Sequence, residues 1–299
     1  MQLEPSRRKS VILSLLDGLK CFPGDKPMKI RSKNLIVVVF LIILSANFGF
    51  SQTPRTAEDY FNRGIEYGKS EKFAEAIADF TKVIQLEPEN AGAYFNRGFA
   101  YDAQGKTNLA IADFSKAIQI DPQDPDAYSS RGNAYYSLGK YGLAIADHTK
   151  AIELEPQNAK PYFNRGVVYN AQDKYDLAIS DFAKAIQIDP QDAIPYYDRG
   201  IAYNAQGKYD LAIADYTKAI QLSPQDVDSF INRGIVYGET GNLESAIADF
   251  TKAIQIDPRK ADAYGNRANA YCLSGKKLLA EADEKRAIEL GGSILEKCK

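Results

Sequence analysis

The apolar residues of this chain recur with two periods at once. Within short stretches they are spaced by three and four residues, as on one face of an α-helix, and the whole set returns every 34 residues from Ala57 to about Ile294. Counting from the start of each unit, positions 4, 8 and 11 form one such face, and positions 20, 24 and 27 form a second. Each unit is therefore predicted to hold two helices that face each other. The units are 57–90, 91–124, 125–158, 159–192, 193–226, 227–260 and 261–294.

Gly, Pro and small polar residues mark the breaks between the predicted helices. Proline at position 32 ends the second helix in the first six units. Thr56 is placed to cap the first helix of the array. Position 15 is predicted to take the left-handed conformation at Gly105, Gly139, Gly207, Gly241 and Gly275. Position 34 is predicted to cap the following helix at Asn90, Asp124, Asn158, Asp192 and Asp226.

Position 8 is glycine in six of the seven units, inside a predicted helix. Glycine there costs roughly 1 kcal/mol relative to alanine, so a close contact between the two helices is the expected reason. The sequence predicts that this contact is with the alanine at position 20, for example Gly64 with Ala76 and Gly98 with Ala110.

This combination of period, small residues at 8 and 20, aromatics at 4, 11 and 24 and proline at 32 resembles the tetratricopeptide repeat family. The resemblance covers residues 57–294. It implies an all-α fold, an α-solenoid of seven helix-turn-helix repeats of 34 residues forming a right-handed superhelix, whose concave side commonly holds a peptide or a partner protein. Because such arrays serve many roles, the resemblance says more about fold than about function.

Arginine at position 7 and aspartate at position 23 occur together in all seven units, from Arg63 and Asp79 to Arg267 and Asp283. Buried charges are normally paired, so these residues are predicted to form partly buried ion pairs, within a unit or between neighbours.

The face of the first helices formed by positions 2, 5, 9 and 12 is the candidate site. In the family this face lines the groove, and here it carries an apolar stripe with a polar break in the third unit, beside a row of asparagines at position 6 that can hydrogen-bond an extended backbone. The alternative is that the bulky residues at positions 5 and 9 pack between successive first helices as core. The candidate groove residues are Phe61, Asn62, Ile65, Phe95, Asn96, Phe99, Asn133, Tyr136, Phe163, Asn164, Val167, Asn170, Tyr197, Ile201, Asn204, Ile231, Asn232 and Ile235.

The residues indicate neither catalysis nor cofactor or metal binding. The single histidine, His148, falls at position 24, where other units have Phe or Tyr, so a core substitution is expected. No second histidine or thiolate accompanies it in a metal-ligand spacing, the acidic residues are periodic, and the glycines are explained by packing and turns. We therefore expect a protein that is not an enzyme.

The N-terminal part resembles an export signal. Basic residues Lys29, Arg31 and Lys33 precede an apolar run at 35–44 and small residues up to Ser51. We expect a signal peptide at 28–51 and a linker at 52–56, with translation starting at Met28 and residues 1–27 as an upstream extension. An uncleaved anchor is the alternative, but the run is shorter than the roughly 20 apolar residues that a spanning helix needs.

Removal of residues 1–51 would change the net charge from −2 to −7, because it takes away eight basic and three acidic side chains. This balance argues against nucleic-acid binding, which needs a basic surface. The mature chain would keep Cys272 and Cys298, whose pairing is left open, and it lacks a cysteine for lipid attachment near its start.

The leading hypothesis is thus an exported scaffold, periplasmic or extracellular and monomeric, that holds a peptide or partner segment with apolar anchors and has no stable membrane span after processing. The alternatives are a self-associating structural array and a glycan- or peptidoglycan-binding module. Residues 276–294, with Glu281 and Glu284 at positions that are apolar or aromatic in earlier units, are expected to form a polar end to the array, followed by a tail at 295–299.

Overall fold

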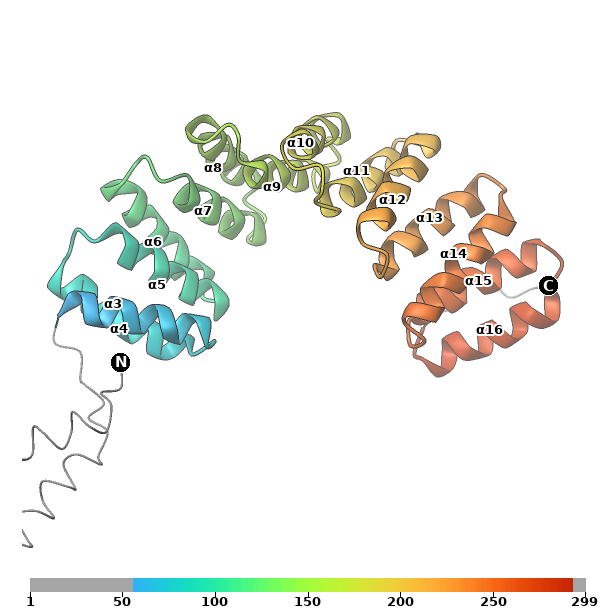
Figure 1. Ribbon diagram of the computed structural model, residues 1–299, viewed down its shortest axis with the longest axis horizontal. Helices are drawn as coiled ribbons and strands as arrows, with labels where there is room; N and C mark the ends of the chain where they lie inside the picture. Colours follow the sequence, from blue (N-terminus) through green and yellow to red (C-terminus); the bar gives the residue numbers. More distant parts are fainter. Residues whose placement is uncertain (1–55, 293–299) are drawn as a thin grey trace, which may run out of the picture. The chain divides into compact units, whose positions relative to one another are not determined.

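The computed structural model describes residues 56–292, all within one compact unit of the chain, Arg55–Lys299. The expected extension, signal peptide and most of the linker, residues 1–55, lie outside the described residues, as do the last two residues of the seventh repeat and the tail. Within the described residues the fold is all-α, with two antiparallel helices in each 34-residue unit (Figure 1). The first helices are α3 (Ala57–Lys69), α5 (Ala91–Ala103), α7 (Pro125–Ser137), α9 (Ala159–Asn170), α11 (Ile194–Ala205), α13 (Val227–Glu239) and α15 (Ala261–Leu273). The second helices are α4 (Phe73–Leu86), α6 (Thr107–Ile120), α8 (Tyr141–Leu154), α10 (Tyr175–Ile188), α12 (Tyr209–Leu222), α14 (Leu243–Ile256) and α16 (Lys277–Glu289). The predicted solenoid of seven helix pairs is confirmed.

The first helices begin at the caps that the sequence predicts, with one shift. Thr56 forms a capping box with Asp59 at the start of α3, and Asn90, Asp124, Asn158 and Asp226 accept hydrogen bonds from backbone N–H groups of the helices that follow them. Asp192 accepts from the N–H of Ile194, so it also satisfies a backbone donor, but α11 begins one residue later than its equivalents. The second helices, by contrast, mostly follow a lysine that provides no side-chain cap.

The turn inside each unit uses a left-handed residue at position 15. The five predicted glycines have φ values between 69° and 80°. The first and fourth units have no glycine here, and Glu71 and Asp173 take the same conformation with φ of 57° and 56°. The left-handed conformation costs free energy for residues that carry a Cβ atom, so these two turns are strained relative to the other five.

The glycine at position 8 contacts a different residue from the one expected. A Cβ atom on Gly64, Gly166 or Gly234 would lie within 2.7–2.8 Å of the ring at position 24 of the same unit, namely that of Phe80, Phe182 or Phe250. In the second unit an added Cβ would meet the ring of Phe114 at 2.9 Å and the backbone of Ala110 only at 3.3 Å. The prediction of a glycine–alanine contact was therefore wrong in its main partner: glycine leaves room for the aromatic ring that closes the core of each hairpin.

The arginines at position 7 all form ion pairs within their own unit. Nε and Nη2 donate to both carboxylate oxygens of the aspartate at position 23, over 2.6–2.9 Å, and the aspartates are 4–7% exposed. The guanidinium also lies 5.6–6.0 Å from the centroids of the aromatic rings at positions 4 and 11. The predicted partly buried ion pairs are thus confirmed, and each has a bidentate, hydrogen-bonded geometry that offsets the cost of burying the two charges.

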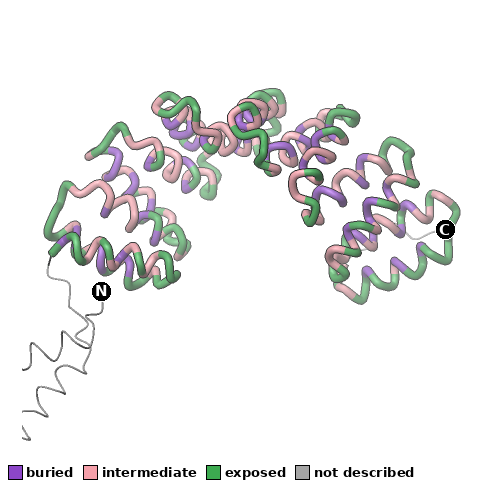
Figure 2. Tube along the Cα trace, in the orientation of Figure 1, coloured by how far each residue is buried: buried purple, intermediate pink, exposed green. Residues whose placement is uncertain are grey.

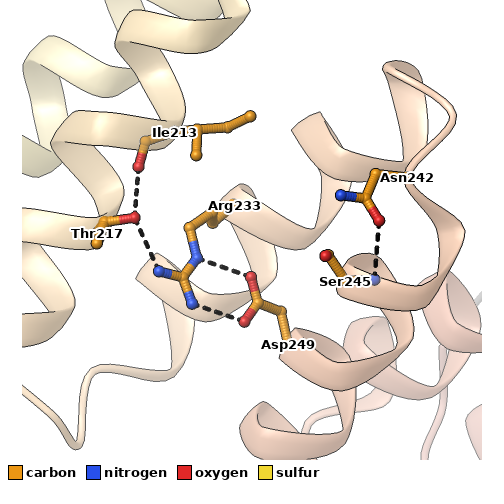
Figure 3. A network of polar contacts seen from close by, with 6 residues as sticks. All are labelled: Ile213, Thr217, Arg233, Asn242, Ser245 and Asp249. Atoms are coloured by element: carbon orange, nitrogen blue, oxygen red, sulfur yellow. Dashed lines mark hydrogen bonds and ion pairs between the residues drawn. The ribbon is translucent and has the colours of Figure 1, made fainter.

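Five of these arginines also form a hydrogen bond to the unit before their own. Figure 3 shows Arg233, whose Nη1 donates to Thr217 of the preceding unit, while the Thr217 hydroxyl donates to the carbonyl of Ile213. Equivalent arginine–hydroxyl bonds of 2.9–3.0 Å join Arg97 to Thr81, Arg131 to Ser115, Arg165 to Thr149 and Arg267 to Thr251. Arg199 lacks this bond because the preceding unit has Ala183 at the hydroxyl position.

The stacking of the units places the first helices on the inner side. Each first helix contacts the next first helix, from α3 and α5 to α13 and α15, whereas no two second helices of the described array contact each other. Elements on the inside of a curved stack are closer together than those on the outside, so the first helices form the concave side. Buried positions follow the lines where helices face each other, and exposed ones gather at the turns (Figure 2).

The C-terminal end of the array is less polar than expected. Glu281 is exposed as predicted, but so are Leu278 and Ile288, at 83% and 55%. Ile288 occupies position 28, whose equivalent Ile118 is buried under the following unit. Within the described residues, no further unit covers Ile288.

Candidate functional site

Shallow hollows lie beside the first helices in two kinds of place. One of about 240 Å³ lies between α3 and α5 and is lined by Ile65, Asn96 and Phe99, and one of about 370 Å³ between α13 and α15 includes Ile235 in its lining. Two others, of about 390 and 350 Å³, include Phe163 and Tyr197 but are lined mostly by the turns between units and the ends of second helices. Of the residues that the sequence places on one face, Ile65, Phe99 and Ile235 therefore lie beside openings between first helices, and Phe163 and Tyr197 beside openings at the turns.

The aromatic residues at position 5 belong partly to the core and partly to the surface. Phe61, Phe95, Phe163 and Tyr197 pack against the ring at position 24 of their own unit, with centroids 5.7–5.9 Å apart. All four nevertheless remain half-buried rather than sealed. The two interpretations of these residues, as groove and as packing, hold together: each ring has one side in the hairpin core and another toward solvent.

Other candidate residues differ in how much surface they offer. Phe99 is 57% exposed, and Ile65, Val167, Ile201 and Ile235 are half-buried. Ile231 is the exception, because it is 6% exposed and belongs to a core cluster with Phe230 and Phe250, so it presents almost nothing to a ligand. Asn133 is exposed and interrupts the apolar stripe as the sequence indicates, while Tyr136 packs its ring 5.8 Å from that of Tyr141.

The asparagine row at position 6 is partly engaged by the protein itself. The side-chain amide of Asn96 donates to the carbonyl of Gly92, that of Asn164 to the hydroxyl of Ser129, and that of Asn232 to the hydroxyl of Tyr197. Asn62 is exposed. At position 12, the Oδ1 atoms of Asn170 and Asn204 are buried without a hydrogen-bond partner among the described residues.

Asp198 also belongs to this face, although it is not among the candidate residues chosen from the sequence. Asp198 occupies position 6 of the fifth unit, where the flanking units have Asn164 and Asn232. Burial raises the pKa of its carboxyl group to about 6. Beside it, burial first and then the negative charges of Asp228, Asp198 and Asp226 raise the pKa of Tyr197 to about 12. The sequence alone could have identified it, because position 6 is asparagine in five units, serine in the third and aspartate in the fifth alone.

Tetratricopeptide repeat models match nearly the whole array. One matches residues 64–105, 100–139, 132–173, 202–241 and 237–275, a second matches 159–192, and a third matches 182–214. The chain belongs to the tetratricopeptide repeat family.

Solved tetratricopeptide repeat structures resemble the array over long stretches. YrrB, described as "a TPR protein with an unusual peptide-binding site", is 26% identical, with 62% of this chain and 95% of YrrB covered and a TM-score of 0.52. MamA is 28% identical, with 56% of this chain and 92% of MamA covered and a TM-score of 0.52. A tetratricopeptide repeat protein from Parabacteroides merdae is 21% identical, with coverage of 79% and 93% and a TM-score of 0.62, and shows the shared fold alone. The comparison with curated proteins finds no match.

His148 takes the place of an aromatic ring in the third tetratricopeptide repeat. It is fully buried, its ring would lie 2.8 Å from a Cβ on Gly132, and neither ring nitrogen has a hydrogen-bond partner among the described residues. Burial, and then the positive charge of Arg165, lower its pKa to about 4. The side chain is therefore neutral near pH 7 and inaccessible, as expected for a core substitution.

The described part of the chain offers no site for a metal ion and no helix that could cross a membrane. It contains no group of three or more His, Cys, Asp or Glu side chains placed to hold a metal ion, and none of its helices has the length and apolar character needed to span a bilayer. Cys272 is half-buried on α15, and Cys298 lies outside the described residues, so the question of their pairing stays open.

Proposed function

We propose that this protein is an exported tetratricopeptide repeat scaffold that binds a peptide or a partner segment with apolar anchors along the inner face of its first helices. The observation that carries the proposal is that apolar side chains of that face stay accessible beside hollows between first helices, Ile65 and Phe99 at one end of the array and Ile235 near the other. A concave surface with apolar pockets and a few polar groups is the usual form of a peptide site. The family is typically a non-catalytic interaction scaffold, and YrrB, one relative, is described as binding a peptide.

Export is part of the proposal and rests on the N-terminal segment. The basic start, the apolar run at 35–44 and the small residues up to Ser51 support cleavage near that point. Mass spectrometry of the protein recovered from the producing cells tests it: a mature N-terminus near Gln52 is expected, and a peptide from residues 10–20 would contradict a start at Met28.

The groove is tested with substitutions that separate binding from packing. Changing Phe95, Phe163 and Tyr197 to Ser should abolish partner capture, but these rings also contact the core, so some loss of thermal stability is expected. Phe99→Ser is the sharper variant because Phe99 is 57% exposed. Its matched control is Leu143→Ser, which removes a 50% exposed apolar side chain from a second helix.

The assay is affinity capture from the exported fraction, followed by titration of the captured partner. Phe99→Ser should weaken binding about tenfold or more, as for an anchor residue, while Leu143→Ser leaves the affinity within about twofold. Equal affinities for the two variants would refute the inner face as the site. Light scattering addresses the alternative of a self-associating array, for which the exposed Leu278 and Ile288 are the candidate contacts.

A further inference from the structure

Asp198 is the one position-6 residue that carries a charge. In the second, fourth and sixth units the asparagine at this position donates a hydrogen bond to Gly92, Ser129 or Tyr197. An ionised carboxylate has no proton to donate and can only accept. The substitution therefore removes the donor that the neighbouring units use and leaves an acceptor in its place.

Asp198 also differs from the aspartates at position 23, which are paired with arginines of the same unit. Each aspartate at position 23 accepts two hydrogen bonds from an arginine. Asp198 has no hydrogen bond and no ion pair within the described array, and burial is the sole cause of its raised pKa. Partial burial makes ionisation of this carboxylate less favourable than at an exposed site, and a positively charged donor placed beside it would offset that cost.

Apolar residues stand one helical turn before and after this carboxylate on α11. Ile194, which is 57% exposed, lies one helical turn before it on α11, and Ile201 lies nearly one turn after it. Tyr197 is its neighbour in the chain and lines the hollow of about 350 Å³ together with Ile194 and Asp228. The aliphatic stem of a long basic side chain fits such surroundings, because it can cover apolar surface while its charged end reaches a carboxylate.

The rest of the inner face has the same sign of charge. Asp228 is neutralised by Lys260 at 2.7 Å, whereas the other carboxylates of the face form no ion pair within the described array. At positions 2, 5, 6, 9 and 12 of the first helices the basic residue is Lys160, and the acidic residues are Glu58, Asp102, Asp126, Asp198, Asp228 and Asp262. Charge complementarity therefore favours a basic segment over an acidic one.

We propose that Asp198 binds a lysine or arginine side chain of the segment held in the groove, and so selects segments in which a basic residue is flanked by apolar ones. This inference rests on the proposed groove function and specifies its ligand. A cation supplies the donors that Asp198 lacks and forms a charge-assisted hydrogen bond in a partly dehydrated place, where such bonds are strong.

The test begins with a random peptide display library panned on the full chain, followed by synthesis of an enriched peptide. Affinities are measured by fluorescence polarisation for the wild type, Asp198→Asn and Asp126→Asn. The first variant restores the asparagine of the flanking units and should fold at least as well as the wild type, which thermal melting checks. The second removes the same charge from an exposed position of the same face.

Enriched peptides should contain Lys or Arg between apolar residues. Asp198→Asn should weaken binding about tenfold or more, and Asp126→Asn by no more than about twofold, because a desolvated pair is worth more than a surface charge. Replacing the peptide's basic residue by norleucine should lower the affinity of the wild type by a similar factor. The same replacement should hardly change the affinity of Asp198→Asn, because that variant has already lost the carboxylate that binds the basic residue.

The outcomes distinguish a failure of the proposed role of Asp198 from a failure of the proposed peptide-binding groove. Peptides without a basic residue, or equal losses for Asp198→Asn and Asp126→Asn, would overturn the role of Asp198 while Phe99→Ser still impairs binding. If no peptide is enriched, or Phe99→Ser has no effect on those that are, the groove itself is refuted and this inference with it.

Discussion

His148 makes a prediction about stability that can be worked out from the structure. The imidazole is fully buried in the third unit with both ring nitrogens unpaired among the described residues. The equivalent ring of the fourth unit, Phe182, would lie 2.7 Å from a Cβ on Gly166, close to the 2.8 Å between His148 and a Cβ on Gly132. His148→Phe should therefore fit without rearrangement and stabilise the protein by about 1–3 kcal/mol at pH 8, the cost of an unsatisfied buried polar group.

The pH dependence gives the stronger test. Folding lowers the pKa of His148 from 6.5 to about 4, so the native state binds this proton more weakly than the unfolded chain. The contribution of neutral His148 is therefore complete above pH 6.5 and is lost as the pH falls from 6.5 toward about 4. At pH 5 the loss amounts to about 2 kcal/mol relative to pH 8, and His148→Phe abolishes it.

The measurement is the urea midpoint of unfolding for wild type and His148→Phe at pH 8, 6.5 and 5. The gap between the two proteins should widen as the pH falls. Phe182→His is the reciprocal control, since it should destabilise the fourth unit and introduce the same pH dependence there. A gap that stays constant from pH 8 to pH 5, or a variant less stable than the wild type at pH 8, would contradict a buried neutral histidine.

Two further predictions concern positions where one unit departs from the others. Ala183→Thr should supply the hydroxyl that Arg199 lacks and raise the free energy of unfolding by about 0.5–1.5 kcal/mol; Ala183→Val has nearly the same shape without the hydroxyl, and an equal gain from both would exclude the hydrogen bond. Glu71→Gly should stabilise the first turn by about 0.5–1 kcal/mol, because Glu71 is left-handed. Gly105→Glu, at an equivalent turn with open space around it, should have the opposite effect; thermal melting of both variants checks the pair, and shifts of the same sign would exclude backbone strain as the cause.

Parts of the candidate site were visible in the sequence and parts were not. Helical spacing put Phe99 and Phe163 on one face, but the structure places Phe99 beside a hollow between two first helices and Phe163 beside one lined mostly by the turns between units. Helical spacing could not show that one side of the Phe163 ring packs against Phe182, or that Ile231 is buried. Burial depends on which side chains of the neighbouring helices pack against each residue. The sequence shows Asp198 as the acidic exception at position 6, but it cannot show that the asparagines at this position donate hydrogen bonds that a carboxylate cannot replace.

By itself the sequence determined the helices, their pairing and their number, since a 34-residue period with caps, turn glycines and two apolar faces leaves little other choice. It could not determine partners across those faces. Arg165 stands 16 residues before Asp181 and 18 residues after Asp147, and periodicity treats the two alike. The tertiary structure pairs Arg165 with Asp181 and joins it to Thr149 of the unit before. It likewise sets the glycines against aromatic rings rather than alanines. The reason is that a repeat gives identical residues to every unit, so only the angle and depth at which the helices pack decide which of two equivalent neighbours comes within contact.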